Sequence, residues 1–224
     1  TKKNIEYLSI CSPNFLHLNH IKLGLKHNLK IICEKPIVMN RSEVNEMINL
    51  KNSKKNKINS ILQLRHHPSL IELKKKLKKS KGNKVILNYY SERDPKYFNS
   101  WKGDNSKSGG IMMNVGIHFF DMMIWFFGKN LKSQITNFKK ELVEGYLYFR
   151  NAKVKWKLHL KKKKSKKLKV RRVIIINKKE IKFSKTFKNL HTLNYEKILR
   201  SRKSNFNESL KSIKLVNQLN QNEI

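Results

Sequence analysis

The stretch IEYLSICSPNFLHLNHIKLGLKHNLKIICEKP, residues 5–36, decides the fold class of this protein. Residues 5–11 and 29–34 are short apolar runs typical of buried strands, and residues 15–27 between them have the pattern of a helix. A strand, a helix and a second strand in this order predict a βαβ unit and a parallel sheet.

The alternation continues beyond this stretch. Asn40, with Glu43 three residues later, forms a capping box that predicts a helix to about residue 53, and residues 58–64 form the next strand. Residues 1–64 are therefore predicted to be a parallel α/β unit.

The pattern changes after residue 64, where strands predominate. Residues 144–160 alternate between apolar and polar side chains on both sides of a turn at 150–152, as an antiparallel hairpin does. We expect further helices and strands at 68–79, 111–127, 190–200 and 206–220, and at 84–92, 170–177 and 180–184, respectively. Residues 65–224 are thus predicted to form an α+β domain.

The chain of 224 residues is strongly basic, with 51 Lys and Arg against 15 Asp and Glu and a formal net charge of +36. Such a balance is typical of proteins that bind nucleic acid or another polyanion. The basic residues are mostly Lys and are spread along the whole chain with abundant Asn and Ile, so we favour compositional drift, with polyanion binding as the alternative. The densest basic run, KKKKSKKLK at 161–169, has no interleaved aromatic residue and is interpreted as a solvated loop.

Signals for a compartment, a membrane or a metal are few. Cys11 and Cys33 each end an apolar run, which suits buried reduced thiols in a cytosolic protein, and neither has the neighbours that a metal site needs. There is no signal peptide, and no apolar run reaches about 18 residues without an ionisable group. We therefore expect a cytoplasmic protein with no metal and no membrane span.

The run GGIMMNVGIHFFDMMIWFFG, residues 109–128, is nearly apolar yet contains three polar side chains. On a helix Asn114, His118 and Asp121 fall at i, i+4 and i+7, so they form a stripe on one face. A lone buried histidine is usually a hydrogen-bonded core residue. Three polar residues in register favour the wall of a cleft instead, because a buried polar stripe is costly unless it is paired.

Polar residues also follow the first two predicted strands. Glu34 and Lys35 end the second strand, and Pro36 restricts Lys35 to an extended conformation. Open α/β sheets bind their ligands at the carboxyl ends of parallel strands. The first strand is followed at the same edge by Pro13, Asn14 and His17.

The segments SICSPNFLH, CEKP and GGIMMNVGIHFFDMMIWFFG, in this order, resemble the Gfo/Idh/MocA family of NAD(P)-dependent sugar dehydrogenases. The segments ILQLRHHPSL, YYSERDPKYFNSWKGDNSKSGGI and FSKTFKNLHTLNYEKIL are similar to one branch, the UDP-N-acetylglucosaminuronate 3-dehydrogenases. The resemblance implies a Rossmann NAD-binding domain, here residues 1–64, followed by a substrate domain, residues 65–224. That second domain has an open, mostly antiparallel sheet, which implies a homo-oligomer formed through the sheet.

By this resemblance Lys35 and His118 are the catalytic residues, and Lys35-Pro36 is a cis peptide. NAD is the implied cofactor, and the implied reaction oxidises the 3-hydroxyl of a UDP-N-acetylhexosaminuronic acid during surface polysaccharide synthesis. The family's position for Asp is occupied by Asn114, as in the branch named above. Which of Lys35 and His118 is the base stays open.

The resemblance also implies the binding residues. The cofactor would contact Pro13, Asn14, His17, Glu34 and Pro36. The substrate would contact Asn114, Arg65, His66, Trp101, Lys102 and His191. Cationic partners are expected for a nucleotide-sugar acid, which carries a pyrophosphate and a carboxylate.

One departure from the family concerns the start of the chain. The strand and glycine-rich G-x-G-x-x-G turn that bind the pyrophosphate are absent from this sequence. We therefore expect either a truncation before Thr1 or a protein that has lost part of its NAD site. The alternatives to the dehydrogenase are an inactive remnant and a basic scaffold that binds RNA or another polyanion.

Overall fold

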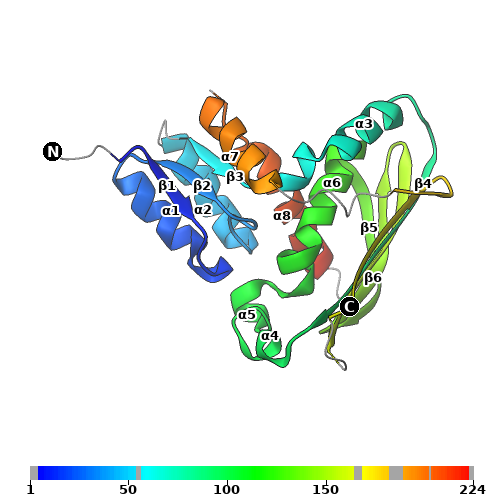
Figure 1. Cartoon of the computed structure of the whole chain (residues 1–224). Helices are drawn as coiled ribbons and strands as arrows, with labels where there is room; N and C mark the ends of the chain where they lie inside the picture. Colours follow the sequence, from blue (N-terminus) through cyan, green and yellow to red (C-terminus); the bar gives the residue numbers. More distant parts are fainter. Residues whose placement is uncertain (1–4, 54–56, 164–167, 182–188, 202, 222–224) are drawn as a thin grey trace.

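A computed structural model describes residues 5–53, 57–163, 168–181, 189–201 and 203–221. Two sheets lie at opposite sides of the molecule, and helices α6 (Ile117–Phe127) and α8 (Phe206–Gln221) lie between them (Figure 1). The first sheet carries the start of the chain, and the second sheet carries most of the remainder. Functional groups from both parts can therefore meet along α6 and α8.

The first sheet has three parallel strands in the order β1-β2-β3: Tyr7–Ile10, Lys30–Cys33 and Ile58–Ser60. Helices α1 (His17–Lys26) and α2 (Arg41–Ser53) connect them. The predicted βαβ units and parallel sheet are confirmed. The third strand ends at Ser60 rather than at residue 64, because a 3₁₀ turn (Gln63–His66) follows it.

Helix α2 begins with the predicted capping box in a modified form. The backbone N–H of Glu43 donates to Asn40 Oδ1 at 2.9 Å. The Glu43 carboxylate accepts from the N–H of Met39 at 2.7 Å, one residue before the cap. The first bond satisfies a donor that a helix start leaves without an intrahelical partner, and the second joins the residue before the cap to the first turn.

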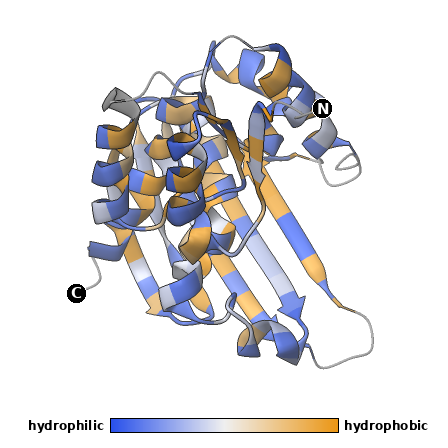
Figure 2. Ribbon diagram, turned by 90° about the vertical axis from the view of Figure 1, so that its left-hand side faces the viewer, coloured by the Kyte–Doolittle hydropathy of each residue, from blue (hydrophilic) through white to orange (hydrophobic). Residues whose placement is uncertain are grey.

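The second sheet has six strands in the order β5-β6-β7-β4-β8-β9. Among the described strands of this sheet only β4 and β7 pair in parallel, so the prediction of an open, mostly antiparallel sheet is confirmed. Hydrophobic and hydrophilic residues alternate along its long strands (Figure 2). The strands β4 to β9 span Asn83–Arg93, Asn130–Lys139, Leu142–Phe149, Ala152–Lys162, Val170–Ile176 and Lys179–Glu180.

Helices cover one face of this sheet, because that face carries the apolar half of each alternation. Trp156 is only 1% exposed and packs edge-to-face on Phe120 of α6, with ring centroids 5.1 Å apart. Helix α3 (Pro68–Leu77) also packs against α6. The opposite face of the sheet carries lysines and is open to solvent.

The last two helices connect the two parts of the molecule. Helix α7 (Leu190–Arg200) returns to the first sheet, where Ile198 packs with Ile32 and Ile61. Helix α8 contacts α2 and β3 on one side and α6 and β5 on the other. The domain boundary between residues 64 and 65 stays a prediction, since part of 65–224 packs on the first sheet.

Three local predictions need correction or fall outside the described residues. Cys11 is exposed rather than buried, because β1 ends at Ile10, whereas Cys33 is buried. In the basic run 161–169, the first two lysines still belong to β7, and residues 164–167 lie outside the described residues. Residues 182–184 of the predicted strand 180–184 also lie outside them.

One helical stretch, Asn105–Phe127, is long and apolar enough to cross a membrane by length and composition alone. In its most apolar window, 78% is buried inside the fold, as in the core helix of a globular domain. Within the described residues no group of three or more His, Cys, Asp or Glu is arranged to hold a metal ion.

Candidate active site

Lys35 lies at the carboxyl end of β2 and reaches into the junction between the two parts of the molecule. Its side chain is 1% exposed, and its Nζ lies 3.6 Å from Asp121 Oδ1 on α6. The same atom lies 3.4 Å from the carbonyl oxygen of Ile117 and 3.4 Å from Ser212 Oγ on α8. Burial lowers the pKa of Lys35 to about 8, although Asp121 opposes the shift. The peptide Lys35-Pro36 is cis, as expected.

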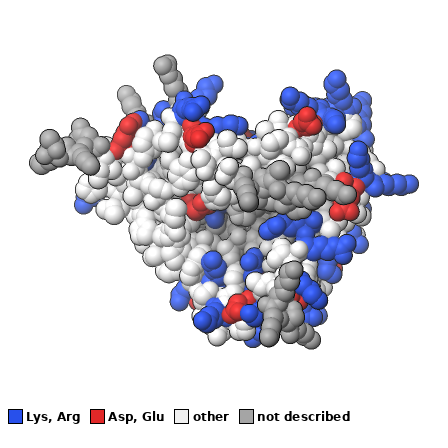
Figure 3. All heavy atoms as spheres, viewed as in Figure 1, with Lys and Arg blue, Asp and Glu red and all other residues white. Residues whose placement is uncertain are grey.

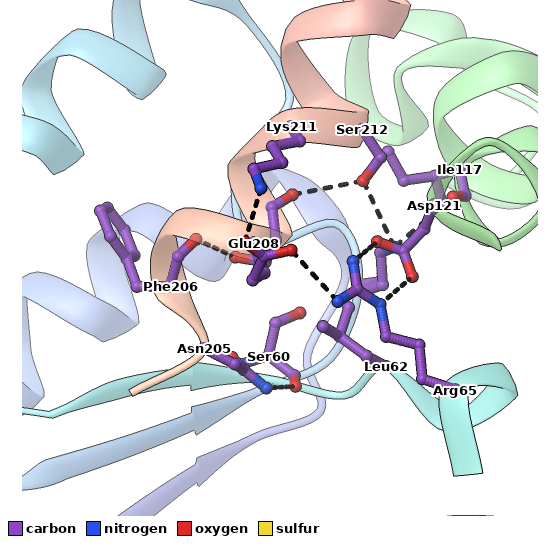
Figure 4. Close-up of polar contacts among 12 residues, drawn as sticks. Ser60, Leu62, Arg65, Ile117, Asp121, Asn205, Phe206, Glu208, Lys211 and Ser212 are labelled. Carbon is purple, nitrogen blue, oxygen red and sulfur yellow. Dashed lines mark hydrogen bonds and ion pairs between the residues drawn. The ribbon is translucent and has the colours of Figure 1, made fainter. Parts of the chain in front are cut away.

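Asp121 pairs with a second cation, Arg65. The guanidinium donates to both carboxylate oxygens, at 2.9 and 3.0 Å, and it contacts Glu208 Oε2 at 3.3 Å (Figure 4). Burial opposes ionisation of Asp121, but Lys35 and Arg65 outweigh it and hold the pKa of its carboxyl below the usual value. Arg65, predicted to contact substrate, is thus engaged by two carboxylates of the protein, which orient it beneath the site.

His118 lies on the first turn of α6, next in the chain to the carbonyl that faces Lys35. Desolvation and the nearby Lys35 charge lower its pKa to about 4. The ring is therefore neutral near pH 7 and can accept a proton. Lys35 comes from the first sheet and His118 from the second domain, so the fold brings together the two residues predicted to be catalytic.

The turn before α6 is wider than predicted. Residues Met112–Gly116 form a π-helix, so the stripe of polar residues is not carried by a regular α-helix. Asn114 and His118 line one cavity of about 240 Å³. Asp121 is buried beneath it and 2% exposed. The Asn114 amide donates to the hydroxyl of Tyr97 at 3.0 Å. Asn114 thus lies within the π-helix, whereas His118 and Asp121 lie on the α-helix that follows it.

Asn14 and His17, which were predicted to contact the cofactor, follow β1 and form hydrogen bonds to the backbone of neighbouring loops. Asn14 donates through Nδ2 to the carbonyl of Ser108 at 2.9 Å, and it directly follows Pro13. His17 is fully buried, with its ring nitrogens 2.6 Å from the Pro36 carbonyl and 2.8 Å from the Ser12 carbonyl. Burial lowers the pKa of His17. This ring therefore holds the loops after β1 and β2 together instead of facing solvent.

Glu34 and His191 meet at the same edge. His191 Nδ1, on α7, lies 3.4 Å from Glu34 Oε1, and burial raises the pKa of that carboxyl. The three remaining predicted residues lie apart from this pair. His66 contacts Lys197 at 3.1 Å, and Lys102 lies over the ring of Trp101 at 5.6 Å. Within the described part of the chain, none of these three forms a hydrogen bond, an ion pair or a ring contact with Lys35 or His118.

The chain is similar in sequence and in fold to known proteins. Residues 1–61 match the sequence model described as the oxidoreductase family NAD-binding Rossmann fold, and residues 83–170 match that of its C-terminal alpha/beta domain. The WlbA (WbpB) dehydrogenase from Thermus thermophilus, solved with NAD and alpha-ketoglutarate, is 34% identical with a TM-score of 0.88. The match covers 96% of this chain and 72% of that one. The chain belongs to the Gfo/Idh/MocA oxidoreductase family.

Other members of the Gfo/Idh/MocA family are also similar. A second structure of the Thermus thermophilus WlbA dehydrogenase, with NAD and UDP-GlcNAcA, has a TM-score of 0.87 at 33% identity, again covering 96% of this chain and 72% of that chain. The uncharacterized oxidoreductase YgjR of Escherichia coli is 30% identical over 141 residues, which are 59% of this chain and 42% of YgjR. The matched part thus spans less than half of this curated relative.

NAD as cofactor is confirmed by the match to the NAD-binding Rossmann fold of the Gfo/Idh/MocA family. The carboxyl edge of β1 and β2, where open parallel sheets bind their ligands, carries polar groups that fit a cofactor such as NAD, namely the buried Lys35 ammonium and the half-buried Glu34 carboxylate. Among the described residues no glycine-rich turn follows β1, β2 or β3. The pyrophosphate end of NAD therefore has no recognisable partner among them.

Several residues of the site were not singled out as site residues in the sequence. Asp121 was recognised only as part of the stripe, and Ser212 gave no signal. Arg93 and Arg172 line the cavity beside His118. Both occupy positions in phase with the buried residues of their strands, β4 and β8, as the pairing of Tyr89 with Arg172 shows. An arginine at a core-facing position of a strand is the signal that could have found them.

Proposed function

We propose that this protein takes part in the NAD-dependent oxidation of the 3-hydroxyl of a UDP-N-acetylhexosaminuronic acid to a 3-keto sugar, in the synthesis of surface polysaccharide. The observation that carries the proposal is the meeting of Lys35 from the first sheet with His118 from α6. The similarity to a WlbA dehydrogenase solved with UDP-GlcNAcA supports the choice of substrate.

His118 is assigned the role of general base. Its ring is neutral near pH 7, because its pKa is about 4, and it lines the cavity in which a sugar hydroxyl would lie. A neutral imidazole within hydrogen-bond reach can take the hydroxyl proton as the carbon is oxidised. NAD, when bound, supplies the acceptor for the hydride that leaves the same carbon.

Lys35 is assigned the role of stabilising charge on the reacting oxygen. With a pKa of about 8 it is mostly protonated near pH 7, and its buried ammonium can donate to an oxygen that gains negative charge. Asp121, Ser212 and the Ile117 carbonyl hold the ammonium in place. Asn114 cannot take a proton, but its amide can orient a neighbouring hydroxyl.

The proposal is tested by measuring NAD reduction with UDP-GlcNAcA, for residues 1–224 and for the same residues together with any coding sequence that precedes Thr1. His118→Asn and Lys35→Met should each lower kcat by roughly 10²-fold or more. His27→Asn, on the exposed end of α1, is the matched control and should retain full activity. Folded protein that binds no NAD in either form would contradict the proposal.

A second candidate function has support from the open face of the six-stranded sheet. Along β7 every second side chain points outward, and four of these are the exposed Lys153, Lys155, Lys157 and Lys161. Lys153 lies 4.8 Å above the Tyr146 ring and 5.3 Å above the Tyr148 ring. Lys and Arg gather along the edge of the molecule where this sheet lies (Figure 3). Rows of lysines beside aromatic rings suit a polyanion such as single-stranded RNA.

A homo-oligomer was expected to form through this same sheet. Two copies that met through this face would place lysines opposite lysines, and their like charges would repel. Titration with a fluorescent oligonucleotide tests polyanion binding. Changing the four β7 lysines to Gln should weaken binding more than changing Lys75, Lys76, Lys78 and Lys79 of α3 and its end, which removes the same charge. Equal losses would show that only net charge matters.

A further inference from the structure

A cavity of about 240 Å³ lies between α6 and the sheet, beside His118. This volume is below the range of about 300–1,000 Å³ that buries a whole drug-sized ligand, so the cavity suits one ring or one charged group. Its polar lining consists of Gln63, Tyr89, Arg93, Asn114, His118 and Arg172. No carboxylate belongs to this lining within the described part of the chain.

The two guanidiniums of this cavity are held on tyrosine rings. Arg93 donates through Nη2 to the Tyr89 hydroxyl at 3.0 Å and lies over the Tyr97 ring at 5.1 Å. Arg172 lies over the Tyr89 ring at 5.9 Å. Stacking of this kind fixes the plane of a guanidinium.

Arg93 has one donor that no described residue uses. Its Nε is buried and has no hydrogen-bond partner among the described residues. A buried unpaired donor is costly, so its presence indicates a partner other than the described residues, as a bound ligand would be. The charge in the cavity is positive, because His118 is neutral near pH 7 and both arginines are always charged. The missing partner is therefore an anion.

We propose that Arg93 and Arg172 form the binding site for the carboxylate of an acidic sugar. The inference rests on the proposed oxidation of a UDP-hexosaminuronic acid. The planar fork of arginine matches a carboxylate with two parallel hydrogen bonds. Because His118 lines the same small cavity, the anion bound there lies within one sugar ring of the reacting carbon. This position favours the sugar carboxylate over the diphosphate of the nucleotide.

Binding measured by calorimetry tests the site without requiring turnover. The probes are UDP-GlcNAcA, and UDP-N-acetylglucosamine, which lacks the carboxylate. Arg172→Gln should weaken UDP-GlcNAcA by about tenfold or more and leave UDP-N-acetylglucosamine unchanged. Arg171→Gln is the matched control, because Arg171 is next to Arg172 on the same strand and equally exposed but points to the opposite face of the sheet. Arg93→Lys keeps the charge and removes the fork, so it should weaken the same ligand.

Equal losses for both nucleotides would overturn the inference, since the arginines would then bind the diphosphate. Equal losses in Arg171→Gln and Arg172→Gln would overturn it as well, because only net charge would matter. If the unmodified protein bound neither nucleotide, the proposed function would fail, and titration with glucuronate against glucose would decide the carboxylate site. Glucuronate binding that Arg172→Gln abolishes would uphold it, and equal binding of the two sugars would refute it.

Discussion

Lys35 Nζ lies 3.6 Å from Asp121 Oδ1, and both side chains are at most 3% exposed. One residue follows a strand of the first sheet, and the other lies on a helix that covers the second sheet. This pair, extended by Arg65 and Glu208, is the polar connection through which the two parts of the molecule hold the candidate site together.

Replacing Asp121 with Asn should destabilise the protein strongly. The change keeps the shape but leaves two buried cations, Lys35 and Arg65, without their carboxylate, which costs about 3–5 kcal/mol. The free energy of unfolding in urea measures this. Asp104→Asn removes a solvent-exposed pair with Lys107 and should change stability little. Equal stability of the two variants would argue against the buried network.

Dehydrogenase activity should depend on pH with two limbs. Below a pH of about 4 His118 becomes protonated and can no longer take a proton, so kcat/KM falls as the pH falls. Above a pH of about 8 Lys35 loses its proton and its charge, so kcat/KM falls as the pH rises. A pH profile of NAD reduction measures both limbs. If kcat/KM instead rose through the upper limb, neutral Lys35 would be the base.

Substituting Phe for His17 should weaken NAD binding. The ring would still fill its buried space, but the single N–H of the neutral imidazole would be lost to the carbonyl of Ser12 or of Pro36, at a cost of about 1–3 kcal/mol. These carbonyls belong to the loops after β1 and β2, where the cofactor is proposed to bind. Losing the bond would therefore leave these loops less firmly positioned for NAD. His27→Phe places the same side chain at an exposed position and serves as the control. Unchanged NAD affinity in His17→Phe would show that NAD binding does not depend on the hydrogen bond between His17 and these loops.

Gly145→Ala should destabilise the second sheet by roughly 1–3 kcal/mol. A methyl group at this position would collide with the Gln134 carbonyl oxygen on β5 and would also crowd the Trp156 ring. Gly82→Ala is the comparison, because nothing lies within 4 Å of the added atom and only its φ of +64° is unfavourable. Thermal unfolding separates the two effects. A smaller loss at Gly145 than at Gly82 would contradict the close packing of β5 on β6.

Much of the fold could be predicted from sequence, because periodicity and capping are local. The βαβ order of the first sheet, the hairpin of β6 and β7 and the cap of α2 all depend on residues a few positions apart. The π-helix at Met112–Gly116 could not be found in this way, since an α-helical pattern and one widened turn place nearly the same apolar residues inward.

For the site, motifs led to Lys35 and His118, and they meet as expected. Motifs gave no means of separating Arg65, which the protein's own carboxylates engage, from the arginines that line the cavity. The sequence by itself determined the two sheets, the family resemblance and the pair of candidate catalytic residues. Only the tertiary structure decided that Asp121 holds Lys35 and that Arg93 and Arg172 face the same cavity. The reason is that these contacts join residues far apart in the chain, and the local pattern carries no record of which distant side chains share one buried space.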